Sequence, residues 1–547
     1  MTATTTGPVP PTRRGRAARL LSGVLVLGLA GGVVAAASAR SAPAPGALPA
    51  ATVDVDAATT TLVCPGPLRL PDDTASGDSA FERVPVAPAE TVTAFDTVAS
   101  GTASLTPLGG TATALEDGTG ALASPSAPVV LRADPVDGEP ARVAGVTSSR
   151  VTDGDLRGLS AGSCARPSSD VWLVGGSTAL ESTADLVVVN PGATAAEVTV
   201  QLWGPNGEAD LANGGTLLVP PGGQQVVVLP AVAAEQRRTV VHVSAAGGQV
   251  SAYLQDSLLD GFTPRGTDLV TAGADPATTQ VVPGLTVPAV DVDDPQAGAL
   301  RLLVPGADAA RVSVRLLGPD GEVPLPGAEG VELAPGEVTD LPLGGLAAGT
   351  YTAVVEATAP VVAGGTVARQ GAPGELDEGP RLERAWSAST ATGSGLVAVP
   401  AGAQGTLALG ALPSGDADPD AAEPVPSATP SPEPTQGQRP DPEAAAEPQG
   451  PTVAVTVRAY GASGVLGTRE VQVPVGATAV LALAELGTGV VGVEVLPDGD
   501  GAAEVAWALV ASVARPDGTL LSVVSPLTDA EAVTQADVRE GRRLGLD

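Results

Sequence analysis

The stretch VTVQLWGPNG, from Val198 to Gly207, occurs in related form twice more along the chain. It returns as VSVRLLGPDG from Val312 to Gly321 and as VTVRAYGASG from Val455 to Gly464. Apolar residues alternate with polar ones in each copy. This period of two is typical of a half-buried antiparallel strand, whose successive side chains point to opposite faces. The residues that follow suit a tight turn. The three copies therefore predict a repeated strand-and-turn unit.

The first two copies keep one register over a long span. Three matched pairs of positions are each 114 residues apart: Gly192 and Gly306, Val198 and Val312, and Gly222 and Gly336. In the third copy, VPAGA (Val399 to Ala403) is separated from the strand by a longer segment, which contains residues 411–451 and is rich in Pro, Ala, Asp and Glu. Such a composition cannot bury enough apolar area to offset its ordering entropy. We expect a disordered insert in a hairpin turn.

Several short strands within roughly 100 residues favour a β-sandwich for each copy. The expected fold class is all-β, with tandem immunoglobulin-like or fibronectin-like β-sandwich modules after a single N-terminal transmembrane helix. A propeller is the rival architecture, but each copy is longer than a typical blade of about 40 to 50 residues. The expected parts are a cytoplasmic basic tail (1–19), a transmembrane anchor or signal sequence (20–39), a disordered spacer (40–60), an N-terminal β unit (61–170), repeat 1 (171–280), repeat 2 (281–375), repeat 3 (376–525) and a C-terminal tail (526–547).

The amino-terminal segment predicts the compartment. An uncharged run from Leu20 to Ala39 follows a cluster of arginines: Arg13, Arg14, Arg16 and Arg19. Twenty helical residues span a hydrocarbon core of about 30 Å, and positive charge before the span keeps that end in the cytoplasm. The expected location is the cell membrane, with a single pass and the bulk of the chain outside. Ala37-Ser38-Ala39 also fits a signal-peptidase site, so secretion after cleavage near Ala39 is the alternative.

The charge of the chain excludes one class of partner. There are 61 acidic and 28 basic residues, which gives a formal charge of −33, and every basic residue is arginine. Nucleic acids and anionic lipid surfaces repel such a chain, because their binding requires phosphates to be neutralised by Lys or Arg. We therefore predict no nucleic-acid partner.

The two cysteines, Cys64 and Cys164, both lie in the exported part. Outside the cell an even number of cysteines indicates a disulfide. A metal pair or a reactive thiol is the other interpretation, but no histidine lies near either cysteine in the sequence. The sequence thus predicts that a bridge ties the two ends of the N-terminal β unit together.

The search for catalytic, cofactor or metal sites finds no candidate residues. His242 is the only histidine, and it is expected on the polar face of a strand; no nucleophile elbow, P-loop or zinc-protease motif is present. Two acidic clusters offer oxygen ligands for calcium, but neither matches an EF-hand loop, and turns are the simpler explanation. The clusters are Asp291, Asp293 and Asp294, and Asp498, Asp500 and Glu504.

Trp203 and Tyr460 are the candidate ligand contacts. They occupy equivalent positions just before the repeated turn, on the polar face of the strand, where a flat ring could stack on a sugar. Leu317 fills the same position in the second copy, which favours a packing role against the end of a sheet or the next module. Both interpretations stay open at this stage.

Three segments carry a resemblance to a known family. They are CPG (Cys64 to Gly66), GLSAGSCARPSSDVWLVGG (Gly158 to Gly176) and LVVVNPGATAAEVTV (Leu186 to Val200). The chain from about residue 60 to 525 resembles an actinobacterial envelope family of unknown function, the DUF5719 family. The resemblance implies a membrane-anchored or secreted protein with no assigned activity, whose gene often lies near that of a cell-envelope glycosyltransferase.

Three hypotheses for the function follow. The first is a non-enzymatic, membrane-anchored extracellular protein of the bacterial cell envelope that is structural or binds a partner. The second is an accessory protein of cell-wall polysaccharide assembly that binds a glycan or a glycosyltransferase. The third, an extracellular hydrolase, rests only on the abundance of carboxylates. The expected partners are the cell membrane, through the N-terminal helix, and an envelope protein or cell-wall glycan.

Overall fold

The computed structural model describes Gly28 and residues 51–54, 56–69, 87–212, 214–292, 294, 297–373, 379–413, 450–498, 503–529 and 535–538. The expected cytoplasmic tail, the expected anchor apart from Gly28, and the insert between residues 414 and 449 lie outside this part of the chain. None of the helices described is long and apolar enough to cross a membrane. The chain divides into two compact units, one from the two terminal segments and one from Ala57 to Ala532.

The terminal unit contains a two-stranded antiparallel sheet. β1 (Ala51–Asp54) pairs with β36 (Gln535–Val538). This pairing corrects the expectation of a disordered spacer at residues 51–54, and it places residues 535–538 of the expected C-terminal tail in a strand. The alternation in ATVD and QADV is short, and a strand of four residues gives little signal unless its partner, nearly the whole chain away, is known.

The larger unit is all-β and contains four sandwiches, the first of which is the N-terminal unit. Its two sheets have the orders β2-β7-β4-β5 and β6-β3-β8-β9. The strands are β2 (Thr60–Cys64), β3 (Ala89–Asp96), β4 (Ser104–Pro107), β5 (Thr113–Ala114), β6 (Thr119–Ala123), β7 (Val129–Ala133), β8 (Val143–Val151) and β9 (Gly158–Ser163).

Repeat 1 has one sheet in the order β10-β16-β12-β13, with β14 also on β12, and another in the order β15-β11-β17-β18. Its elements are β10 (Asp170–Val174), β11 (Ser182–Asn190), β12 (Ala196–Gly204), β13 (Gly207–Ala209), β14 (Thr216–Val219), β15 (Gly223–Val228), α2 (Leu229–Val232), β16 (Val240–Ala246), β17 (Ser251–Asp260) and β18 (Thr263–Val270).

Repeat 2 builds both layers around one long strand. β25 pairs with β19 and β21 in its first half and with β20 and β26 in its second half. Because β26 pairs with β25, repeat 2 extends beyond the boundary at residue 375 that the sequence suggested. The strands are β19 (Ala277–Val287), β20 (Ala299–Leu303), β21 (Ala310–Gly318), β22 (Gly321–Pro324), β23 (Val331–Leu333), β24 (Thr339–Pro342), β25 (Gly349–Gln370) and β26 (Leu382–Ala388).

Repeat 3 has sheets in the orders β30-β29-β32-β27-β35 and β31-β28-β33-β34. Its elements are β27 (Gly395–Ala398), β28 (Gln404–Pro413), β29 (Thr452–Gly461), β30 (Gly464–Pro474), β31 (Thr478–Ala482), η3 (Leu483–Glu485), β32 (Gly492–Pro497), β33 (Ala503–Arg515), β34 (Gly518–Val524) and β35 (Leu527–Thr528). The long insert follows Pro413 and so connects β28 to β29, which belong to different sheets. The expectation that it lies in a hairpin turn is wrong.

The repeated strand of the sequence is confirmed as β12, β21 and β29. In β12 the side chains of Val198, Val200 and Leu202 are buried in the sandwich, whereas Glu197 and Thr199 are exposed. β21 and β29 alternate in the same way over most of their length. The pattern holds because each strand has one face on a sandwich interior.

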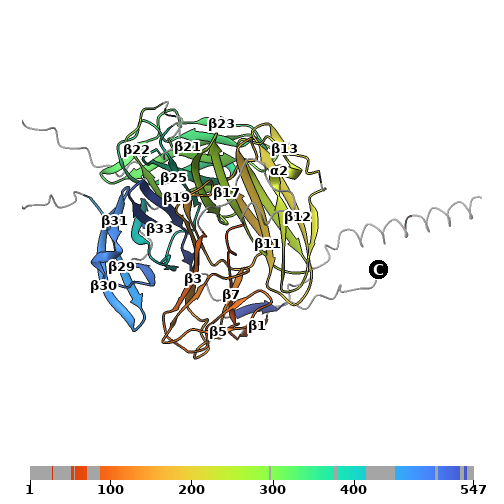
Figure 1. The fold of residues 1–547 in the computed structure, drawn as a ribbon, viewed down its shortest axis with the longest axis vertical. Coiled ribbons are helices and arrows are strands. Elements are labelled where there is room, and N and C mark those ends of the chain that lie inside the picture. The colour runs from red at the N-terminus through yellow and green to blue at the C-terminus, as the bar shows by residue number, and fades with distance from the viewer. Residues whose placement is uncertain are drawn as a thin grey trace, which may run out of the picture. The chain divides into compact units, whose positions relative to one another are not determined.

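The sequence predicts tandem modules and leaves open how they pack; in the structure the sandwiches pack against one another. Apolar clusters join each one to the next: Val63 with Val187, Trp172 with Leu303, and Val281 with Leu412. Phe95 of the N-terminal unit packs on Tyr460 of repeat 3, with ring centroids 5.4 Å apart, so the last sandwich also contacts the first. The four sandwiches form a closed ring, seen in Figure 1 as orange, yellow-green, green and blue segments in succession.

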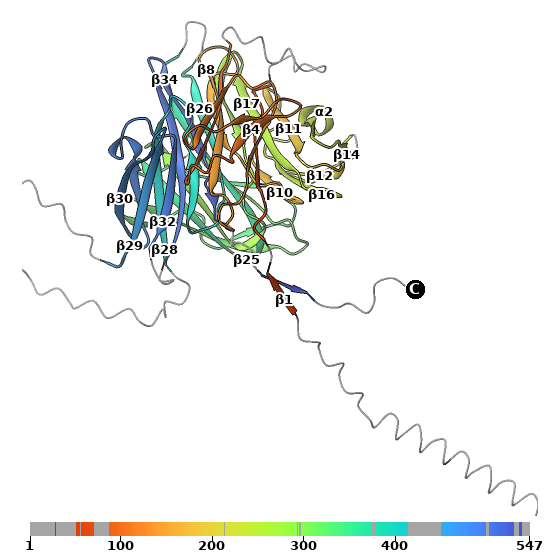
Figure 2. The ribbon, with the colours of Figure 1, turned by 90° about the horizontal axis from the view of Figure 1, so that it is seen from below.

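All four contacts around the ring use the same two surfaces. The sheet that ends in the last strand of one sandwich packs on the opposite sheet of its neighbour. Such head-to-tail contacts close into a ring when the rotation between neighbours allows it. The last strands β9, β18, β26 and β34 lie next to one another around the axis, and Figure 2 shows the ring from the side.

The outer faces of the sheets explain why the sandwiches pack together. Trp203, Leu317 and Tyr460 lie on the face that alternation assigns to solvent, yet all three are buried. Each belongs to a cluster between neighbouring sandwiches. Leu108, which follows β4 in the N-terminal unit, packs in the same way on repeat 1. One apolar position per sandwich therefore helps to bury an outer sheet face that would otherwise be exposed to solvent.

Candidate functional site

The axis of the ring is the first candidate site, because charged and polar side chains are buried there. Asp268, on β18, accepts hydrogen bonds from the backbone N–H of Trp386 on β26 (2.8 Å) and from the hydroxyl of Ser522 on β34 (2.9 Å). A longer bond of 3.4 Å comes from the backbone N–H of Ala161 on β9. One carboxyl thus joins its own strand to the three other innermost strands.

Glu383, on β26, makes a second set of bonds across the axis. Its Oε1 accepts the backbone N–H of Leu159 on β9 (2.9 Å) and that of Leu521 on β34 (3.2 Å). Arg157, just before β9, lies 3.4 Å from the other oxygen of Glu383 and also donates to Asp517 (3.0 Å). Glu383 therefore joins β26, β9 and β34, which are three of the four strands that Asp268 connects.

Close backbone approach makes these bonds possible. A Cβ on Gly158 would lie 2.6 Å from the carbonyl oxygen of Thr267, so β9 can approach β18 only with glycine there. Gly266 has a φ of +98°, and a Cβ on it would lie 2.5 Å from the backbone nitrogen of Arg384. Glycine is the residue that tolerates both the positive φ and the short distance.

Burial raises the pKa of Asp268 to about 8 and the pKa of Glu383 to about 8, because a carboxylate is poorly solvated inside the protein. The N–H donors to both groups oppose this rise, as does Arg157 beside Glu383. The contact with Arg157 is too long, at 3.4 Å, to outweigh the burial. Both carboxyls therefore hold their protons through neutral pH.

A second polar network lies beside the axis and joins repeats 1 and 2. The ring of Trp386 has the guanidinium carbons of Arg301 and Arg384 at 5.0 and 5.6 Å from its centroid, and its Nε1–H donates to Asp256 (2.7 Å). Arg301 also binds both oxygens of Asp340, at 2.8 and 3.0 Å, and reaches a backbone carbonyl of repeat 1. Cation–π contacts and bidentate ion pairs of this kind fix relative orientation.

The bonds named above run from buried side chains to neighbouring sandwiches. Their chemistry is suited to holding four strands in one arrangement. It is less suited to catalysis, because a reacting group must meet its substrate and these two acids are fully enclosed by protein.

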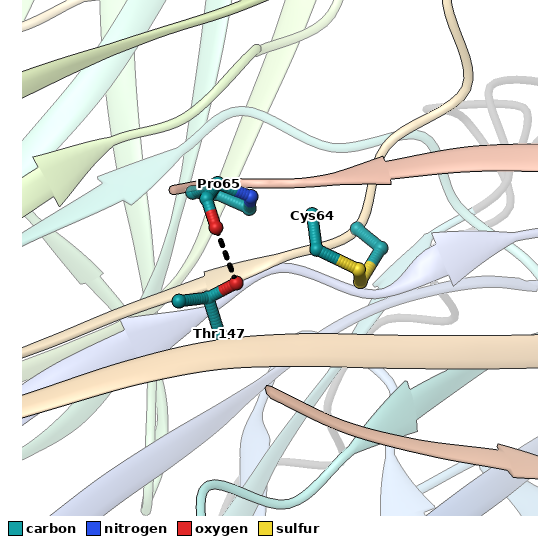
Figure 3. Close-up of a disulfide and its surroundings, with 4 residues drawn as sticks. Cys64, Pro65 and Thr147 are labelled. Carbon is teal, nitrogen blue, oxygen red and sulfur yellow. Dashed lines mark hydrogen bonds between the residues drawn. A yellow bond between two sulfur atoms is a disulfide. The ribbon is translucent and has the colours of Figure 1, made fainter. Parts of the chain in front are cut away.

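The predicted disulfide is present between Cys64 and Cys164 (Figure 3). It joins the end of β2 to the residue that follows β9, and both cysteines are buried in the N-terminal sandwich. The Thr147 hydroxyl donates to the carbonyl of Pro65 beside the bridge (2.7 Å). The bridge therefore ties an innermost strand of the ring to the opposite sheet of its own sandwich.

Trp203 and Tyr460, the predicted ligand contacts, lie in different interfaces of the ring. Trp203 is 6% exposed and stacks on Trp172, with centroids 5.5 Å apart, while Tyr460 is 5% exposed and donates to Glu494 (2.8 Å). The structure does not bring the two rings together, and it covers both with a neighbouring sandwich. Their surroundings match the packing role that was left open from the sequence.

His242 lies at the edge of the same interface as Trp203. Its ring stacks on Trp172 (4.1 Å between centroids), and its nitrogens lie 3.0 Å from Asp170 and 3.2 Å from Gln201. These contacts hold the imidazole against a tryptophan. They do not place it beside a nucleophile.

The two acidic clusters that could suggest calcium are only partly described, because Asp293 and Asp500 lie outside the described residues. Within the part of the chain that the structure does describe, no group of three or more His, Cys, Asp or Glu could hold a metal ion. Asp291 and Asp294 line a hollow of about 1040 Å³ on repeat 2, together with Arg369 and Gln370.

Comparison with known proteins identifies the family. A family model described as a family of unknown function (DUF5719) matches residues 119–425. This chain belongs to the DUF5719 family. The match begins at β6 of the N-terminal unit and extends through repeats 1 and 2 into repeat 3.

Matches to other proteins add little to this. No curated protein matches the chain. One solved structure, described as "Crystal Structure of Thermotoga maritima 1070", is similar at 19% identity over 21% of this chain and 93% of its own, with a TM-score of 0.16. Another, described as "Biofilm associated protein - BSP domain", is similar at 10% identity over 90% of this chain and 99% of its own, with a TM-score of 0.10.

Sequence reasoning missed the residues of the axis. Asp268 and Glu383 stand in the short segments TPRGTDLV and LERAWSA, where a polar residue reads as an exposed position. The available signal was positional: each segment is the last strand of its repeat and carries a charge among buried neighbours. The role of these two acids can be inferred from that signal only when the last strands are known to lie next to one another.

Proposed function

We propose that this member of the DUF5719 family is a non-enzymatic, membrane-anchored extracellular protein of the bacterial cell envelope, and that it is a rigid platform for a partner. The observation that carries the proposal is the closed ring, whose four sandwiches are joined by apolar interfaces and by a buried polar axis. A ring without free ends between its modules has fewer hinges than a linear array, so it can hold surface groups of different sandwiches at fixed separations.

Two further features support the location. The buried disulfide is typical of oxidising compartments outside the cytoplasm. The arginines before Leu20 and the apolar run that ends at Ala39 suit an anchor whose short end stays in the cytoplasm. Release after cleavage near Ala39 is the alternative that the experiment below separates.

The location is tested with a phosphatase reporter that folds only in an oxidising compartment, fused after Asp547 of the full chain. We expect an active reporter in the membrane fraction. The Val26→Arg variant should be retained less in the membrane, because it places a charge within the expected span. Active reporter in the medium, with an amino terminus at Arg40, would support the cleaved form. An inactive reporter, or free thiols at Cys64 and Cys164 in cells, would contradict the proposal.

The non-enzymatic part has its own test. The purified full chain, in neutral detergent, is assayed against panels of glycosidase and esterase substrates. We expect no turnover above that of a heat-denatured sample. Turnover that remains with the protein after further purification would contradict the non-enzymatic function and would favour a hydrolase.

A further inference from the structure

A groove of about 710 Å³ lies between the N-terminal unit and repeat 1, and its lining is unusual for so acidic a chain. Two arginines, Arg132 and Arg166, line it together with small, hydroxyl and amide residues and no carboxylate. Three other hollows of the described chain each contain acids: Asp291 and Asp294, Glu139 and Asp529, and Glu116 and Asp117. With 61 acidic and 28 basic residues overall, a groove with only positive charge stands out.

Neither arginine is neutralised by an ion pair among the described residues. Arg132 donates only to the backbone carbonyl of Pro191 (3.1 Å), and Arg166 only to that of Thr528 (3.1 Å). Asp529 is the nearest charge that acts on Arg166, but its carboxylate is bound by Arg142 (3.1 Å). Arg166 is exposed to solvent, so its guanidinium is accessible from the groove.

The neutral part of the lining offers hydrogen bonds. Thr60 and Thr61 on β2, Thr194 and Gln249 in turns of repeat 1, and Thr59 contribute hydroxyl and amide groups. Hydroxyls and amides both donate and accept, so they suit a ligand that carries many hydroxyls. The hydroxyls of Thr59, Thr60 and Thr194 already donate to Asp134 and to the carbonyls of Ala141 and Gly247, so these three offer a ligand their acceptor lone pairs.

The walls of the groove are held in place by buried bonds. The side chain of Asn190, which is fully buried, donates to the carbonyls of Thr194 (2.7 Å) and Val219 (3.1 Å) and accepts from the N–H of Gly192 (2.9 Å). On the strand side, Thr61 is the cross-strand partner of Arg132. The arginine and the opposing turn are therefore preformed.

From this geometry we infer that the groove binds an acidic saccharide, whose carboxylate or phosphate groups bind Arg132 and Arg166 and whose hydroxyls bind the threonines and Gln249. The planar guanidinium fork matches both kinds of anion. The volume is that of an ordinary ligand site, within about 300 to 1,000 Å³. The lining has prolines but no large apolar side chain that would hold a lipid tail or anchor a peptide.

This inference rests on the proposed function and deepens it, since it names the ligand class of a surface exposed outside the cell. The proposed location and the proposed ligand can be contradicted independently of each other. The location is read from a reporter in cells, whereas the ligand is tested by binding to the purified chain.

The test is titration of the full chain, in neutral detergent, with oligogalacturonate as a carboxylate probe and with a phosphorylated oligomannose as a phosphate probe. The fully methyl-esterified oligogalacturonate is the matched neutral ligand. We expect at least one anionic probe to bind at least tenfold more tightly than the neutral one, and the probe that binds identifies the source of the anion. Equal binding of charged and neutral forms, or no binding of either probe, would overturn the inference.

The variant R132Q/R166Q should weaken binding of the anionic probe at least about tenfold, because both charge-assisted contacts with the anion are lost. The control variant is R311Q, which changes an exposed arginine on repeat 2. It should bind the probe as tightly as the wild type does. An unchanged thermal midpoint shows that the double variant is folded, and R132K/R166K, which keeps charge but loses the fork, should bind with intermediate affinity. Wild-type affinity in the folded double variant, or oligoglutamate bound as tightly as the saccharide, would contradict the assignment.

Discussion

The sandwich interiors and the axis of the ring are both buried, but opposite chemistries stabilise them. The interior of repeat 3 contains Trp507 among valines, leucines and alanines, whereas the axis contains Asp268, Glu383 and Arg157. Apolar interiors gain free energy from removing surface from water and tolerate many arrangements of similar volume. The hydrogen bonds of the axis are directional, so they form only when the four last strands lie next to one another in the observed arrangement.

The difference suggests a division of labour between the two regions. Apolar burial supplies most of the free energy of each sandwich, and the axial network selects one arrangement of the four. Buried polar groups have this role of specifying structure in some proteins, at a cost in stability. For this ring the idea can be tested by changing one region while the other is kept.

The largest effect should come from the bridge that connects the two regions, because Cys64 belongs to the sandwich and Cys164 follows an axial strand. The sequence separation of the cysteines is 100 residues, and closing such a loop stabilises the folded state by about 4 to 5 kcal/mol in the chain-entropy model. We expect the C64S/C164S variant to lose about that much free energy of unfolding, measured by denaturant titration. A loss below about 1 kcal/mol would mean that the ring holds its first sandwich together without the bridge.

A cavity in a sandwich interior should cost slightly less. Trp507, on β33, is fully buried, and its Nε1–H donates to the carbonyl of Gly393 (3.0 Å). W507A should lower the free energy of unfolding by about 3 to 5 kcal/mol, since it removes a large side chain and leaves a cavity. W507F is the matched variant and should lose less. A W507A protein with wild-type stability would show that repeat 3 has no rigid apolar interior.

The axis should respond to pH in a way that the interiors do not. The pKa of Asp268 and that of Glu383 are raised to about 8 in the folded protein, whereas both are near 4 in an unfolded chain. The folded state therefore binds more protons between these values, and the free energy of unfolding should fall as pH rises from about 4 to 8.

The expected contribution of the two acids is about 1 to 3 kcal/mol per pH unit in that window. D268N/E383Q should show a flatter dependence when chemical denaturation is repeated at several pH values. E332Q changes an exposed carboxylate of repeat 2 and should keep the wild-type slope. If the free energy of unfolding of D268N/E383Q depends on pH as steeply as that of the wild type, the two axial acids do not cause the dependence.

The fold class could be predicted from the sequence because it depends on local alternation. Val198, Val200 and Leu202 face one interior, and the same pattern predicts β21 and β29. The disulfide was predictable from the number of cysteines and from the extracellular location that the N-terminal segment suggests. Each of these inferences needs only neighbours in the chain or a count of residues.

The ring could not be predicted in this way, because it depends on contacts between distant segments. Trp203 and Tyr460 look exposed by alternation, and only the presence of a neighbouring sandwich explains their burial. Asp268 and Glu383 likewise gain partners from other sandwiches. The groove with Arg132 was also missed, since its two walls come from different sandwiches.

Closure of the ring is tested most directly by the contact between its first and last sandwiches. Phe95 and Tyr460 have ring centroids 5.4 Å apart, and aromatic pairs in contact couple by about 0.5 to 1.5 kcal/mol. A double-mutant cycle with F95L, Y460L and the combined variant, measured by denaturant unfolding, should give a coupling energy in that range. Additive effects, within about 0.3 kcal/mol, would show that the first and last sandwiches do not meet and would contradict the ring.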